Sequence, residues 1–163
     1  MIKLVSMDEV FAMAVQIEDN AARFYRKAAD LSNGKSSTDV FEKLAAMEDG
    51  HKQKFAAMRE AAPRPSDGPE ELEQEGAMYL EAIASGYRVE GSPKVAEELT
   101  GGESVVDILR LATELEKQAI LFYLGLKKVV SDAPTQQVLD DIIDEEKEHF
   151  VSLIVELRKE EGT

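Results

Sequence analysis

The nine residues IEDNAARFY at positions 17–25 return as LEKQAILFY at positions 115–123, and this recurrence decides the fold. Both stretches read as an apolar residue, Glu, two polar residues, Ala, two variable residues, Phe and Tyr. The same offset of 98 residues superposes a Glu-x-x-His motif at residues 48–51 on another at residues 146–149. Self-similarity at a fixed offset is the signature of a repeated structural unit. The sequence therefore predicts two copies of one unit.

Apolar residues recur every three or four positions in four long segments, which is the periodicity of amphipathic helices. Ser6 and Glu9 form a capping box at the first helix start. Ser104 and Asp107 form a similar capping pair at the start of the third helix, with Asp in place of Glu. Pro63 ends the second helix. The four predicted helices cover about residues 6–31, 38–62, 104–130 and 134–157. They form two pairs, which span about residues 6–62 and 104–160.

The two helix pairs are joined by a long connection, about residues 63–103, that contains short helical patterns near 69–85 and 92–99. An up-and-down bundle would need a short link here, whereas one long crossover is the connectivity of the ferritin-like bundle. We therefore predict an all-α, ferritin-like four-helix bundle of two helical hairpins joined by a partly helical crossover. It forms a single domain over residues 1–163. Glu81, in the crossover, is not assigned as a ligand.

Composition narrows the classes of function. The net charge of −14 argues against nucleic acid as a partner, because phosphate binding requires basic side chains. No stretch approaches the roughly 18 to 20 apolar residues that cross a bilayer, and the apolar start is too short for a signal peptide. We expect a cytoplasmic protein without a membrane partner. The absence of cysteine excludes disulfides and cysteine-ligated iron within these 163 residues.

Six side chains of the repeat have the chemistry of a two-metal site. In Glu-x-x-His the two side chains lie three residues apart, on one face of a helix. The chain has only two histidines, and each follows a glutamate at this spacing. Four carboxylates would balance two divalent cations, whereas a buried cluster without metal suffers like-charge repulsion and desolvation. The predicted metal ligands are Glu18, Glu48, His51, Glu116, Glu146 and His149.

The sequence leaves the metal and the surroundings of the site more open. Oxygen and imidazole donors suit iron, manganese and zinc alike. Tyr25 and Tyr123 lie seven residues after the first glutamate of each repeat. They are either core residues or hydrogen-bond partners of a ligand carboxylate, with a redox-active phenol as a further reading. The neighbouring glutamates Glu114, Glu145 and Glu148 point to other helix faces and are expected in solvent.

The order Glu, Glu-x-x-His, Glu, Glu-x-x-His, with Phe-Tyr after the first and third glutamates, resembles the ferritin-like domain of rubrerythrins. The resemblance covers about residues 6–160. It implies a di-iron site with the six ligands named above. It also implies two-electron reduction of hydrogen peroxide, or oxidation of ferrous iron by oxygen species, usually in a homodimer. Iron binding or sequestration without turnover is the alternative function, and a helical interaction module is a third.

Two departures from the rubrerythrin pattern accompany the resemblance. Rubrerythrins proper carry a cysteine-ligated rubredoxin module that delivers electrons, and this chain has no cysteine. It therefore looks like a stand-alone member that takes electrons from a separate donor protein, with peroxide or dioxygen as its small substrate. Rubrerythrins also have an additional third-helix glutamate three residues from another ligand. Here the positions three away from Glu116 are Thr113 and Ala119, which bears on peroxidase chemistry rather than on metal binding.

Overall fold

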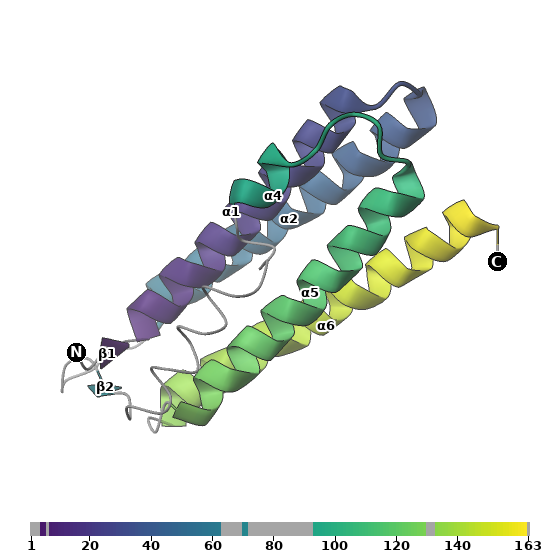
Figure 1. Ribbon diagram of the computed structural model, residues 1–163. Helices are drawn as coiled ribbons and strands as arrows, with labels where there is room; N and C mark the ends of the chain where they lie inside the picture. Colours follow the sequence, from purple (N-terminus) through teal and green to yellow (C-terminus); the bar gives the residue numbers. More distant parts are fainter. Residues whose placement is uncertain (1–3, 6, 63–69, 72–92, 130–132, 163) are drawn as a thin grey trace.

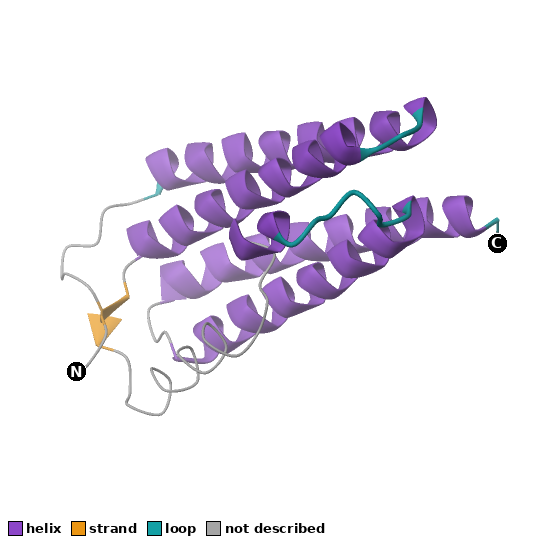
Figure 2. Ribbon diagram, turned by 45° about the horizontal axis from the view of Figure 1, so that its top comes forward, coloured by secondary structure: helices purple, strands orange, loops and turns teal. Residues whose placement is uncertain are grey.

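Four long helices dominate the structure and lie side by side as two antiparallel hairpins (Figures 1 and 2). The computed structural model describes residues 4–5, 7–62, 70–71, 93–129 and 133–162. The first hairpin is α1 (Met7–Leu31) with α2 (Lys35–Ala61), and the second is α5 (Val105–Val129) with α6 (Ala133–Glu161). The predicted all-α, ferritin-like four-helix bundle is confirmed.

Two helix boundaries differ from the prediction. The helix α2 begins at Lys35 rather than near Thr38, and the Thr38 backbone N–H already donates to the Gly34 carbonyl at 3.0 Å. Polar residues that suggest a turn also suit a first helical turn, where backbone N–H groups have no intrahelical partner. The helix α6 continues to Glu161, a few residues beyond the predicted end near 157, and Arg158 in its last turn complements the negative end of the helix dipole.

The part of the crossover that the structure describes contains a short helix and a short strand. The helix α4 (Pro93–Glu97) packs against α1, at the position where the sequence predicts a helix. The strand β2 (Glu70–Glu71) pairs antiparallel with β1 (Leu4–Val5), so the predicted helical stretch near 69–85 is wrong at these two residues. The rest of that stretch, with Glu81, lies outside the described residues.

Two apolar clusters fill the interior and leave the middle of the bundle to polar side chains. Along α2, Phe41 and Leu44 belong to one cluster and Phe55 to the other, and the Glu-x-x-His motif lies between them. The Phe55 cluster consists of Val10, Phe11, Ala14, Ile17, Phe55, Ala119, Tyr123, Leu126, Leu139, Ile142 and Ile143. The Leu109 cluster consists of Phe24, Tyr25, Ala28, Ala29, Phe41, Leu44, Ala45, Val95, Leu99, Ile108, Leu109, Ala112, Leu115 and Leu153.

The turn before α5 is held by a glutamate, and this gives a pH-dependent prediction. The Glu103 carboxylate accepts hydrogen bonds from the backbone N–H groups of Thr100 at 3.0 Å and Gly101 at 2.9 Å. Together with the Thr100 hydroxyl, these donors lower the pKa of Glu103 from 4.5 to about 2. A lowered pKa adds stability above the unfolded-state value, and this stability is lost as pH falls from about 4.5 toward 2.

We expect the Glu103→Gln variant to be less stable than the wild type near neutral pH, and this deficit to shrink at low pH. Urea unfolding of both proteins at about pH 6 and about pH 3 measures the difference. An unchanged difference at the two pH values would show that the carboxylate charge has no part in holding the turn.

Candidate metal centre

Six polar side chains from the four long helices meet midway along the bundle, between the Phe55 and Leu109 clusters. The four carboxylates and one imidazole are no more than 2% exposed. Burying four carboxylates in apolar surroundings is costly unless they have partners. The residues are those that the sequence predicts: Glu18 on α1, Glu48 and His51 on α2, Glu116 on α5, and Glu146 and His149 on α6.

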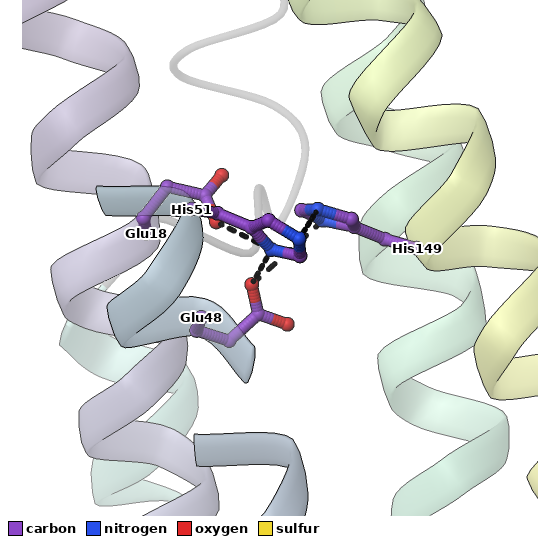
Figure 3. Close-up of side chains that lie close together, drawn as sticks. All are labelled: Glu18, Glu48, His51 and His149. Atoms are coloured by element: carbon purple, nitrogen blue, oxygen red, sulfur yellow. Dashed lines mark hydrogen bonds and ion pairs between the residues drawn. The ribbon is translucent and has the colours of Figure 1, made fainter. Parts of the chain in front are cut away.

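Each hairpin contributes one histidine between two carboxylates. In the first hairpin the Nδ1 atom of His51 lies 3.3 Å from Glu48 Oε2 and 3.7 Å from Glu18 Oε2. Figure 3 shows both carboxylates directed toward this ring. The second hairpin repeats the arrangement, with His149 Nδ1 at 3.5 Å from Glu146 Oε2 and 3.5 Å from a Glu116 oxygen. The duplication seen in the sequence is therefore also a duplication of local geometry.

The two half-sites join into one centre through their imidazoles. The rings of His51 and His149 are stacked, with centroids 3.4 Å apart and an interplanar angle of 21°. Their Nε2 atoms are 2.8 Å apart, and His149 Nδ1 lies 3.7 Å from Glu48 Oε2 of the other hairpin. Potential ligand atoms within 4.8 Å of one another form two overlapping groups: Glu18, Glu48, His51 and His149, and Glu116, Glu146 and His149.

The buried Glu48 carboxylate and the buried His149 imidazole of the centre shift one another's pKa values. Burial opposes ionisation of Glu48, but the His51 hydrogen bond and the His149 charge outweigh it and lower the pKa of Glu48. Burial likewise opposes the charging of His149, but Glu146 and Glu48 outweigh it and raise the pKa of His149. Without metal, these shifts favour an ionised Glu48 beside a protonated His149. A divalent metal that binds there would displace the proton from His149.

The donor atoms also fit a pair of metal ions. Glu48 Oε1 and Glu146 Oε1 are buried and accept no hydrogen bond from any residue that the structure describes. Carboxylate oxygens and imidazole nitrogens are donors for iron, manganese and zinc. The role of the six residues as ligands stays a prediction, but two divalent ions would satisfy these atoms and neutralise the four carboxylates.

The two tyrosines lie in the apolar clusters rather than among the six polar residues. Tyr25 and Tyr123 are each 0% exposed, and each ring meets the preceding phenylalanine edge-on, at 5.2 Å and 5.4 Å between centroids. Their interpretation as core residues is confirmed. A further role beside a ligand carboxylate stays a prediction.

The third-helix positions that depart from the rubrerythrin pattern offer no carboxylate. Ala119 is 0% exposed and belongs to the Phe55 cluster. Thr113 is buried, and its hydroxyl donates to the Leu109 carbonyl at 2.5 Å. Neither position therefore supplies a seventh carboxylate ligand.

Of the three flanking glutamates, two behave as expected and one does not. Glu114 and Glu148 are exposed. Glu145 is only 18% exposed and forms an ion pair with Lys54, so its prediction as a solvated residue is wrong. No sequence signal could reveal this pair, because it depends on how α2 of one hairpin lies beside α6 of the other.

Comparison with known proteins agrees with the geometry of the centre. A sequence model described as rubrerythrin matches residues 9–157, nearly the whole bundle. The chain belongs to the rubrerythrin family. A rubrerythrin implies a di-iron site, and the facing Glu and His side chains are where this rubrerythrin would hold one. No curated protein gives a match.

Solved structures share the fold of this rubrerythrin. One neighbour, from Thermotoga maritima, is described as a ferritin-like diiron-carboxylate protein; it is 23% identical over 98% of each chain, with a TM-score of 0.60. A hypothetical protein from Pyrococcus furiosus is 19% identical over 94% of this chain and 89% of its own, with a TM-score of 0.51. At these identities the likeness concerns the fold alone.

None of the helices that the structure describes has the length and hydropathy of a membrane-spanning segment.

Proposed function

We propose that this rubrerythrin is a di-iron redox protein that reduces hydrogen peroxide or oxidises ferrous iron. The observation that carries the proposal is the pair of buried half-sites, each with two carboxylates and one histidine, whose imidazoles meet across the hairpins. Iron is the preferred metal, with manganese and zinc as alternatives. When bound, two ferrous ions supply two electrons and an open coordination position for peroxide or dioxygen.

The six side chains of the centre have different proposed roles as metal ligands. Glu18 and Glu116 are proposed as the outer carboxylate ligands and the two histidines as the imidazole ligands. Glu48 would be the carboxylate ligand shared between the hairpins, because its Oε2 lies near the histidines of both, at 3.3 Å and 3.7 Å. Glu146 is its counterpart in the repeat. The apolar clusters on either side exclude water and strengthen the electrostatic interactions of these groups.

The proposed reaction requires a source of electrons outside the metal centre. Reduction of peroxide to two waters consumes two electrons and two protons. These 163 residues contain no cysteine for a rubredoxin-type centre, so we propose a separate electron-donor protein. The homodimer implied by the rubrerythrin resemblance is also a proposal, which the mass in solution tests.

Iron binding without turnover is the second candidate, and the lack of a carboxylate three residues from Glu116 is the observation that favours it. Thr113 and Ala119, both buried, occupy the two positions where the family resemblance would place the exchangeable carboxylate associated with peroxidase chemistry. A protein of this kind would bind ferrous iron and oxidise slowly, whereas a store would take up many more than two irons per chain.

A single-turnover experiment tests the redox proposal. The protein is loaded anaerobically with two ferrous ions per chain and mixed with one equivalent of hydrogen peroxide, or with dioxygen in a parallel sample. Rapid growth of ferric near-ultraviolet absorption, complete at one peroxide per two irons, is the expected result. Faster oxidation by dioxygen would favour ferroxidase chemistry. Iron that stays ferrous with both oxidants would contradict a redox function and leave sequestration.

A further inference from the structure

The two imidazoles of the centre differ in their access to solvent. The His51 side chain is 18% exposed, whereas His149 and all four carboxylates are at most 2% exposed. Figure 3 shows His51 reaching from α2 toward His149 on α6. The exposed edge of His51 is therefore the part of the centre that meets solvent.

An ion pair between α2 and α6 lies one helical turn from the two histidines. Lys54 is one helical turn after His51 on α2, and Glu145 is one turn before His149 on α6. Their side chains form a salt bridge that joins the two hairpins. Glu145 directly precedes Glu146 in α6, so its backbone lies next to that of a proposed ligand.

The ion pair has no equivalent in the internal repeat. At the same offset of 98 residues, Lys54 corresponds to Ser152 and Glu145 corresponds to Met47. The equivalent positions on the other side of the stacked imidazoles are therefore uncharged. Six residues of the centre match between the halves, whereas the charged pair beside it occurs in one copy.

The ion pair contributes little to the stability of the fold. The Lys54 side chain is 51% exposed, so water screens its attraction to Glu145. Partly exposed ion pairs of this kind add little to stability and break readily. When the pair opens, a carboxylate with a free negative charge stands next to the exposed edge of His51.

We propose that the Lys54–Glu145 ion pair is a latch over the His51 edge, and that divalent cations reach the buried carboxylates past it. This inference rests on the proposed metal centre. Glu145 is the anion that first attracts an incoming cation, and Lys54 competes with the cation for it. Glu145 and Lys54 are positioning residues for metal loading and are not ligands.

The proposal predicts opposite effects from two variants that break the same ion pair. Lys54→Met frees Glu145 and should speed cobalt(II) uptake, whereas Glu145→Gln leaves an unpaired lysine and should slow it. One elementary charge about 8 Å from a divalent cation in water changes the rate by about fivefold in each direction at low salt. The difference should shrink at high ionic strength, while both variants still bind two metals per chain at equilibrium.

The measurement is stopped-flow uptake of cobalt(II) by the metal-free protein, followed by its visible absorption. Arg110→Met and Glu161→Gln are matched controls, because they make the same charge changes at an ion pair between α5 and α6. Glu161 lies twelve residues, about 18 Å, along α6 from His149. These controls should match the wild type within twofold.

Two other outcomes would overturn the proposal. Rates that move in the same direction in both latch variants, or stay at the wild-type value, would mean that the ion pair is only a structural contact. The metal centre would then stand without the latch. A wild type that takes up no cobalt would contradict the metal centre itself, and the latch with it.

Discussion

Saturating divalent metal should stabilise this protein strongly, and only if both hairpins keep their ligands. Metal that binds the folded state and not the unfolded chain adds about 4 kcal/mol per site at a thousand times the dissociation constant. The half-sites lie on different hairpins, with Glu18 beside His51 and Glu116 beside His149. Two ions between them would join the hairpins, so unfolding would have to release both.

Urea unfolding with cobalt(II) and with a chelator measures this stabilisation. We expect Glu18→Gln in the first hairpin and Glu116→Gln in the second to lose most of it, and by similar amounts. Glu114→Gln is the control, because the Glu114 side chain is 61% exposed and lies on a different face of α5 from Glu116. Full stabilisation of one of the two ligand variants would mean that the metal is held by a single hairpin.

The long helices and the two Glu-x-x-His motifs could be predicted from the sequence, because each depends on residues that are close together in the chain. Helical periodicity depends on neighbours three and four residues apart, so the four long helices could be located within a few residues. The pairing of Glu48 with His51, and of Glu146 with His149, depends on the same spacing. The repeat then related the two motifs, and the structure places their histidines in contact.

The parts that sequence could not supply depend on how separate elements lie together. The ion pair of Lys54 with Glu145 joins residues of different hairpins and leaves no periodic trace. The greater exposure of His51 than His149 likewise cannot be read from two identical motifs. The pairing of Glu70–Glu71 with Leu4–Val5 is similar, because it connects a few residues far apart in the chain.

The second large effect concerns Glu48 and Glu146, the proposed carboxylate ligands of the two Glu-x-x-His motifs. Removing Glu48 and Glu146 together deletes one ligand from each Glu-x-x-His motif and halves the buried negative charge that a metal pair must balance. We expect the Glu48→Ala/Glu146→Ala variant to lose tight metal binding altogether. Glu42→Ala/Glu148→Ala removes two exposed glutamates from the same two helices and serves as the matched control.

The most direct test of the account is therefore a count of iron. Each protein is loaded anaerobically with excess ferrous iron, separated from unbound metal, and assayed for iron per chain. We expect two irons per chain in the wild type and in the control, and close to none in the Glu48→Ala/Glu146→Ala variant. Equal iron in that variant and the wild type, or no stoichiometric iron in the wild type, would contradict the assignment of the centre.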